Sequence, residues 1–327
     1  MASNFRLSLL LATHRVLINS INREFDMTET FANQASNNYS DAHVRESRRP
    51  LLLLEPEQRM AICLEDVFLD YPIADSILKS IDYMLQSKNK VQAPCMLIWG
   101  EGGYGKTSLI RKIKERNVEQ TNKLVFMSMR QTPENYNFRE LLLEAFGIPL
   151  TKKFSGFNAS KEFARTVAHN NIKGIVIDEI HDALTLTPFQ QRANLSLLKN
   201  LSGEQFNLSV IASGTEKASE ALRLDAQLER RYLQWPLAKW ELDENFRSFL
   251  LAYERTLPLK NQSRIWDEVI ARMILKTSSG IMDNVAKIIQ IAAAEAIRTG
   301  EEQISAEIIE HVHRLAPHYG VSLMKSQ

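Results

Sequence analysis

One short segment restricts what this chain can fold into more than any other feature. Residues Gly100 to Thr107 read Gly-Glu-Gly-Gly-Tyr-Gly-Lys-Thr and match the phosphate-binding pattern GxxxxGK[ST]. The apolar run Met96 to Trp99 precedes this segment and an amphipathic segment follows it, so strand, loop and helix are expected in that order. Glycines let backbone N–H groups surround a phosphate, and the helix N-terminus adds positive potential. The segment therefore predicts an α/β fold with a nucleotide site.

Each position of this loop has an expected chemical task. Lys106 is expected to bridge the β- and γ-phosphates, and Thr107 to hold Mg²⁺ through its hydroxyl group. ATP and Mg²⁺ are the predicted ligands. The residues expected around the phosphates are Gly100, Glu101, Gly102, Gly103, Tyr104, Gly105, Lys106, Thr107 and Ser108.

A second apolar run, Gly174 to Ile177, ends in the two acids Asp178 and Glu179. A buried parallel strand beside the phosphate loop would place both carboxylates near the metal. Asp178 is the expected partner of nucleotide-bound Mg²⁺, through water, and Glu179 is expected to orient and deprotonate the attacking water. The alternative for Glu179 is a solvated acid at a strand end. A single histidine after a strand is more often structural than catalytic, and His181 is expected to lie behind the residues that contact the nucleotide.

Two later segments carry candidate catalytic residues. Either Ser213 or Thr215, at the end of the next strand, is expected to contact the γ-phosphate and the attacking water. The alternative for Thr215 is capping of the helix that follows it. Either Arg230 or Arg231 is expected to reach a neighbouring subunit's γ-phosphate, and the alternative is that both complement a helix C-terminus.

The order of predicted elements indicates three parts of the chain. Residues 1–60, with an Asn/Ser-rich tract, are expected to be a partly flexible N-terminal extension. Residues 61–238 alternate strand and helix patterns, which predicts a five-stranded parallel sheet. Residues 239–327 carry helical patterns alone, which predicts a small all-α lid. The expected strands are 96–99, 124–127, 174–177, 208–212 and 232–235.

Composition limits the partners and the cellular compartment that fit this chain. Forty Lys plus Arg against 39 Asp plus Glu leave a formal charge of +1, so any nucleic-acid surface must be local. The two cysteines, Cys63 and Cys95, have no metal-ligand or redox spacing, which favours a reducing cytoplasm. No apolar run is long enough to predict a membrane span.

Together these motifs resemble an AAA+ ATPase, with the phosphate loop as Walker A and Ile175 to Glu179 as Walker B. Shorter motifs resemble the TniB/TnsC family of ATPases from Tn7-like transposition systems of bacteria. They are Phe68-Leu69-Asp70-Tyr71-Pro72, Asp178-Glu179-Ile180-His181, Ser213-Gly214-Thr215-Glu216-Lys217-Ala218 and Ser279-Gly280-Ile281. The resemblance covers about residues 61–316.

The resemblance implies an oligomer, a ring or a helical filament, that assembles on double-stranded DNA. It implies two protein partners, a TniQ-type target selector and a DDE transposase, and ATP hydrolysis that controls disassembly and target choice. It also places Tyr71 and Pro72 near the adenine, whereas simple packing against the first helix is the alternative. Gly280 to Asn284 lacks the sensor-2 arginine of many AAA+ lids, and Lys287 is a weak substitute.

The segment after the second predicted strand is the expected DNA contact. Lys152, Lys153 and Lys161 lie there with Arg165 against a single acid, Glu162. A few lysines on the phosphate backbone would give sequence-independent, salt-sensitive binding. The alternative is a solvated run of charge.

Two other functions fit the phosphate site, besides a nucleotide-binding scaffold with little turnover, against which the intact Glu179 argues. One is another DNA-handling AAA+ ATPase, of the origin-recognition or helicase-loader type. The other is a signalling NTPase switch that does not bind DNA, although the sequence shows none of the repeats that such switches usually carry.

Overall fold

The computed structural model describes residues 41–87, 90–119, 123–129, 137–148 and 157–323. The chain divides into two compact units, Met1–Asp41 and Ala42–Gln327. All described strands and α-helices belong to the second unit. Lys152 and Lys153, two of the expected DNA contacts, lie outside the described residues.

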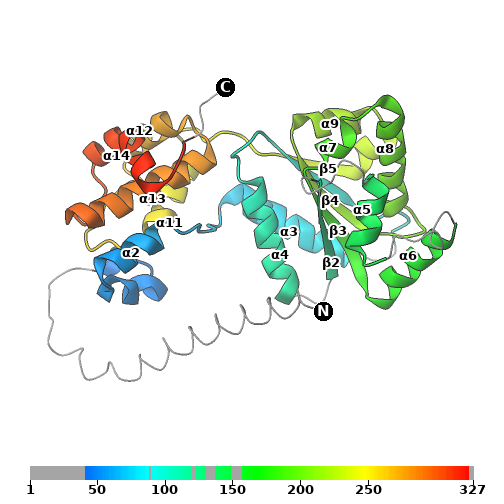
Figure 1. Ribbon diagram of the computed structural model, residues 1–327, viewed down its shortest axis with the longest axis horizontal. Helices are drawn as coiled ribbons and strands as arrows, with labels where there is room; N and C mark the ends of the chain where they lie inside the picture. Colours follow the sequence, from blue (N-terminus) through cyan, green and yellow to red (C-terminus); the bar gives the residue numbers. More distant parts are fainter. Residues whose placement is uncertain (1–40, 88–89, 120–122, 130–136, 149–156, 324–327) are drawn as a thin grey trace, which may run out of the picture. The chain divides into compact units, whose positions relative to one another are not determined.

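Five strands form one sheet in the order β2-β3-β4-β1-β5, and every neighbouring pair is parallel (Figure 1). The strands are β1 Cys95–Trp99, β2 Lys123–Ser128, β3 Ile172–Asp178, β4 Ser209–Gly214 and β5 Tyr232–Pro236. The predicted five-stranded parallel sheet is confirmed. Because the strands are parallel, their carboxyl ends meet at one edge, which is where α/β sheets bind ligands.

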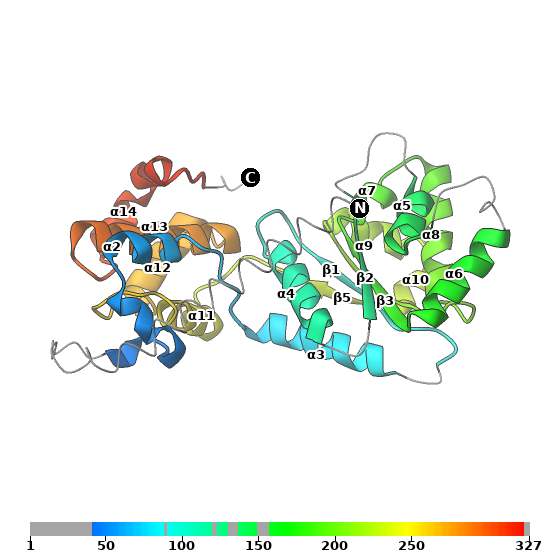
Figure 2. The ribbon, with the colours of Figure 1, turned by 60° about the horizontal axis from the view of Figure 1, so that its bottom comes forward.

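Helices cover both faces of this sheet. Helices α3 Pro72–Gln86 and α4 Lys106–Glu119 lie on one face, which Figure 2 shows from below. The helices on the other face are α5 Phe138–Ala145, α6 Phe157–His169, α7 His181–Leu184, α8 Pro188–Ser202, α9 Glu216–Arg223 and α10 Ala226–Arg231.

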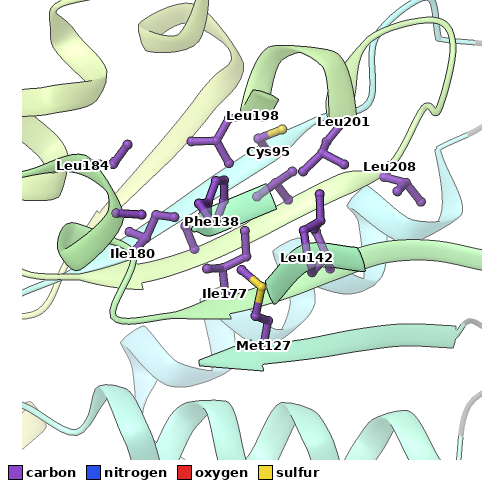
Figure 3. Close-up of a cluster of buried hydrophobic side chains, with 14 of the residues drawn as sticks. Cys95, Met127, Phe138, Leu142, Ile177, Ile180, Leu184, Leu198, Leu201 and Leu208 are labelled. Atoms are coloured by element: carbon purple, nitrogen blue, oxygen red, sulfur yellow. The ribbon is translucent and has the colours of Figure 1, made fainter. Parts of the chain in front are cut away.

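The alternation of side chains along β1 separates the two cores. Met96 and Ile98 face α3 and α4, whereas Leu97 faces the opposite core. Figure 3 shows that second core, with Ile177 of β3 against Phe138 of α5. Both faces of the sheet are buried, which explains the continuous apolar strands in the sequence.

The C-terminal part is a helical cluster around α13, whose residues from Ile288 to Ile297 are all buried. Its helices are α11 Glu244–Glu254, α12 Glu268–Ser278, α13 Met282–Thr299 and α14 Ala306–Leu315. The described residues also include the short 3₁₀ helices η2 Asp41–His43, η3 Glu46–Leu53 and η6 Ala316–Tyr319. An α13 that is apolar around most of its circumference must be surrounded by other helices.

The structure differs from the expected extension over residues 42–60. Helix α2 Pro56–Cys63 packs against α13, and Val44 is buried. Arg59 is 1% exposed; it donates to both carboxylate oxygens of Glu302, at 2.7 and 2.6 Å, and to the carbonyl of Pro258. A bidentate carboxylate partner far along the chain makes the burial of Arg59 possible.

A buried carboxylate fixes the loop after α11. Glu254 is 3% exposed, and its oxygens accept the backbone N–H groups of Ser263, Arg264 and Ile265 at 2.9 to 3.0 Å. In Glu254→Gln, an amide NH₂ group would face these donors. We expect a loss of roughly 2–4 kcal/mol in unfolding free energy, since hydrogen bonds to a charged group are lost.

Urea unfolding followed by circular dichroism measures this loss. Glu241→Gln is the matched control because Glu241 is exposed just before the same helix. Equal unfolding free energies for the two variants would show that the loop does not depend on Glu254.

Candidate nucleotide site

The phosphate loop connects β1 to α4. Gly103 and Gly105 have φ angles of +80° and +90°, a region that residues with a Cβ rarely adopt. The side chain of Lys106 is buried, and its Nζ donates to the carbonyls of Gly100 at 2.6 Å and Glu101 at 2.9 Å. The loop thus holds its lysine inside the curve of its own backbone.

The carboxyl ends of β1, β3 and β4 are joined by polar contacts. Asp178 Oδ1 accepts the backbone N–H of Glu179 at 3.0 Å and the hydroxyl of Ser213. Ser213 is 1% exposed and lies opposite Ile98 of β1 in the parallel register. Ser213 therefore fixes the orientation of Asp178 beside the phosphate loop.

Glu179 follows in an unusual backbone conformation. Its φ is +55°, and its residue exposure is 4%. The next residue, Ile180, donates its N–H to the carbonyl of Ser213 at 2.8 Å, which ties this turn to β4. His181, expected to lie behind the residues that contact the nucleotide, has its Nδ1 at 3.1 Å from Glu179 Oε2. A strained residue held at a strand end is a frequent feature of functional sites.

A cavity of about 350 Å³ adjoins the loop. Phosphate-loop residues form one part, and apolar side chains from α11 and α13 form another. Its lining is Asp66, Val67, Phe68, Leu69, Tyr71, Gly102, Gly103, Gly105, Lys106, Thr107, Ser108, Arg111, Phe249, Tyr253, Met282, Asp283, Ala286 and Gln290. An apolar pocket with a polar end suits a nucleotide, with its base in the apolar part.

Tyr71 is one of the lining residues, as expected for a residue near the adenine. Its ring lies 5.6 Å from that of Trp240 and 6.2 Å from that of Phe249, measured between centroids. Burial raises the pKa of Tyr71 to about 12, so its phenol stays neutral. Pro72, in contrast, begins α3 and does not line the cavity.

Some expected nucleotide residues lie beside the cavity rather than in its wall. Gly100, Glu101 and Tyr104 belong to the loop without lining the cavity, and Asp178 and Glu179 stand at the strand edge. Partial burial and the charge of Glu101 raise the pKa of Tyr104. The loop and the acid pair thus contribute different parts of the site.

Sequence reasoning missed several residues of this cavity. Arg111 lines it and pairs with Asp66, whose carboxylate lies 3.4 Å from the guanidinium. Its spacing of four residues from Thr107 on one helix face was the signal that could have placed it here.

We expect Arg111→Ala to weaken ATP binding about 5- to 10-fold, because a cation in the wall of a phosphate-binding cavity favours an anionic ligand. Titration with a fluorescent ATP analogue measures the change. Lys114→Ala is the control, since Lys114 is exposed on the same helix and does not line the cavity. If both variants bind as tightly as the wild type, Arg111 does not contact the nucleotide.

The lid touches the phosphate loop at the start of α13. The backbone N–H of Asp283 donates to the carbonyl of Gly103 at 2.9 Å. Lys287, the weak sensor-2 substitute, instead pairs with Asp283 at 2.7 Å and donates to the carbonyl of Ser322. An acid therefore stands in the cavity wall near this contact, and Lys287 balances its charge.

The structure separates the paired candidates at the sheet edge. Thr215 occupies the N-cap position of α9, but its side chain makes no capping bond, and its buried Oγ1 has no hydrogen-bond partner among the described residues. Arg231 donates to the carbonyl of Lys199 and to Ser202 on α8, whereas exposed Arg230 donates to Ala226 within its own helix. Arg231 thus forms hydrogen bonds with the C-terminal end of α8.

The donor set suits Mg²⁺. Thr107 offers a hydroxyl and Asp178 a carboxylate, and hard oxygen ligands few in number are what Mg²⁺ takes beside a nucleotide. Both hydrogen bonds to Asp178 found in the described part of the chain reach Oδ1, so Oδ2 can accept from a metal-bound water. No cluster of three acidic, His or Cys side chains suited to a metal occurs among the described residues.

A parallel sheet with a phosphate loop after β1, two acids at the end of β3 and a helical lid on the loop is the architecture of the AAA+ class. The chain is a P-loop ATPase of this class. The family model described as "Bacterial TniB protein" matches residues 59–242, which is more than half of the chain. The chain belongs to the TniB family. No curated protein matches it.

Solved structures with the same fold include ORC and Cdc6 proteins. The ORC2 protein of Aeropyrum pernix superposes with a TM-score of 0.54 at 14% identity, covering 76% of this chain and 69% of that chain. Cdc6p of Pyrobaculum aerophilum gives 0.54 at 16%, covering 79% and 70%. Drosophila ORC bound to DNA gives 0.53 at 13%, covering 90% and 73%. At such identities the likeness shows a shared fold.

Within the described ranges, no helix has the length and apolar character that crossing a membrane would require.

Proposed function

We propose that this protein is an ATP-dependent regulator of DNA transposition that assembles as a ring or helical filament on target DNA. The observation that carries this proposal is the TniB family match, which spans both the phosphate loop and the acid pair of β3. Membership of this family supports the transposition setting, a TniQ-type target selector and a DDE transposase as partners, and the bacterial cytoplasm as the location.

The site residues divide the work of hydrolysis. Lys106 and the loop N–H groups bind the phosphates, and Thr107 and Asp178 hold Mg²⁺, which would stabilise negative charge on the phosphates. Ser213 keeps Asp178 oriented. Glu179 takes the proton of the attacking water. Arg230 of a neighbouring subunit completes the site.

DNA binding is assigned to a small number of lysines. Lys161 is exposed on α6, and Lys152 and Lys153 precede this helix in the sequence. The name of one similar structure, Drosophila ORC bound to DNA, supports DNA binding by an AAA+ fold of this type. Repeating a few phosphate contacts in many subunits would offset a net charge of +1.

Sedimentation and ATPase rate, with and without duplex DNA, test this function. In a slowly hydrolysed ATP analogue, we expect large assemblies that need DNA and weaken steeply with salt. Charge reversal of Lys152, Lys153 and Lys161 should abolish them, while reversal of Lys276, exposed on α12 of the lid, should not.

Origin-recognition or helicase-loader activity is the second candidate, because the similar structures include ORC and Cdc6 proteins. DNA-dependent assembly without any effect on transposase recruitment would favour it. A protein that ignores DNA in every nucleotide state would contradict both candidates and favour a signalling switch.

A further inference from the structure

The side chain that touches the proposed water-activating acid comes from the next helix. His181 is the first residue of α7, and its Nδ1 lies 3.1 Å from Oε2 of Glu179. Both groups are shielded, with side-chain exposures of 20% for His181 and 5% for Glu179. A contact of this kind between shielded groups is screened little by solvent.

The backbone fixes where these two side chains start. Glu179 sits in the left-handed region, Ile180 is bonded to β4, and the N–H of Asp182 donates to the carbonyl of Glu179 at 3.1 Å. Gly214 of β4 packs so closely here that a Cβ on it would lie 3.2 Å from Ile180 and 3.5 Å from the backbone nitrogen of His181. The turn therefore packs closely against β4.

Nδ1 of His181 lies near an acceptor but makes no complete hydrogen bond among the described residues. Nδ1 is buried, and among the described residues no acceptor meets it along the direction that a hydrogen bond requires. Glu179 Oε2 is within bonding distance but off that line, so a small rotation of either side chain completes the bond. A buried ring nitrogen gains from such a partner.

The chemistry of a general base explains what this bond would do. A carboxylate must present one oxygen to the water whose proton it takes, and a donor on its second oxygen sets that orientation. We propose that His181 is a positioning residue for ATP hydrolysis, whose Nδ1–H holds Oε2 of Glu179 so that the other oxygen faces the attacking water. This proposal rests on the function proposed for Glu179.

Three replacements of His181 distinguish the position of its hydrogen-bond donor from the size of its side chain. In His181→Asn the amide nitrogen takes the place of Nδ1, in His181→Gln it takes the place of Nε2, and in His181→Ala there is no donor. We expect kcat for ATP to fall roughly 10- to 100-fold in the Ala and Gln variants, as for other groups that orient a functional ligand. The Asn variant should stay within about 3-fold of the wild type, and KM should stay within about 2-fold in all three.

His313→Ala is the matched control. His313 is exposed on α14 and does not line the cavity, so the loss of its imidazole should leave kcat unchanged. Thermal midpoints and nucleotide affinity show that each variant folds.

A double variant tests whether His181 acts through Glu179. In a Glu179→Gln background, adding His181→Ala should lower kcat no further. Glutamine at position 179 cannot take a proton, so its orientation no longer affects turnover. Full additivity would overturn the proposal, as would equal losses in the Asn and Ala variants or a normal kcat in His181→Ala. If Glu179→Gln itself keeps wild-type turnover, the role of Glu179 fails first, and that outcome is distinct from a failure confined to His181.

Discussion

Glu179→Gln is expected to lower ATP turnover by about 10²- to 10⁴-fold, the contribution typical of a general base. Glutamine keeps the size and the hydrogen-bonding oxygen of Glu179 but cannot take a proton from water. The phosphate loop and the cavity are unchanged, so nucleotide affinity should remain within about 2-fold. On DNA the variant should accumulate as an ATP-bound assembly that does not dissociate.

Steady-state phosphate release and sedimentation on duplex DNA measure both effects. Glu220→Gln is the control, since Glu220 is exposed on α9 and the same charge is removed there. Unchanged turnover in Glu179→Gln would mean that the acid at the end of β3 only shapes the turn. If the wild type also hydrolyses little ATP, the protein is a nucleotide-binding scaffold.

Arg230→Ala is expected to lower turnover in the assembled protein by about 10³-fold, because an arginine supplied in trans stabilises transition-state charge. Arg230 is exposed, and its guanidinium makes one hydrogen bond in the described part of the chain, to its own helix. It can therefore reach a neighbouring subunit without breaking a tertiary contact. Nucleotide binding by the single subunit should be unaffected.

Arg231→Ala provides the contrast. Its loss leaves the carbonyl of Lys199 and the hydroxyl of Ser202 without this donor, so we expect about 1–2 kcal/mol lower stability and a nearly normal turnover per folded molecule. Denaturant unfolding and ATPase rate distinguish the two variants.

Mixing two inactive variants tests action in trans. A site with its own Glu179 but a mutated Arg230 should recover turnover when its neighbour is Glu179→Gln, because that neighbour supplies the arginine. Mixtures that stay inactive at every ratio would contradict the role of Arg230 in trans.

Part of this site could be predicted without a structure because its motifs consist of consecutive residues. The glycines, lysine and threonine of the loop lie within Gly100 to Thr107, and the acids directly follow the apolar residues of β3. Since each motif holds its own local geometry, residue order is enough to predict strand, loop and helix. The five parallel strands followed from the same alternation of patterns.

Contacts between distant segments could not be read in this way. Arg59 reaches Glu302, Arg111 reaches Asp66, and the lid meets the loop through Asp283. Each partner is an ordinary polar residue whose role depends on what packs beside it. The packing of residues 42–60 and the part of the cavity wall formed by α11 and α13 were missed for this reason.

The sequence by itself determined the phosphate loop and the acid pair of this ATPase, because each motif consists of consecutive residues. The tertiary structure decided which of two adjacent arginines is engaged by α8, and how His181 lies against Glu179. Adjacent residues of a helix point in different directions, and only packing shows which direction meets a partner.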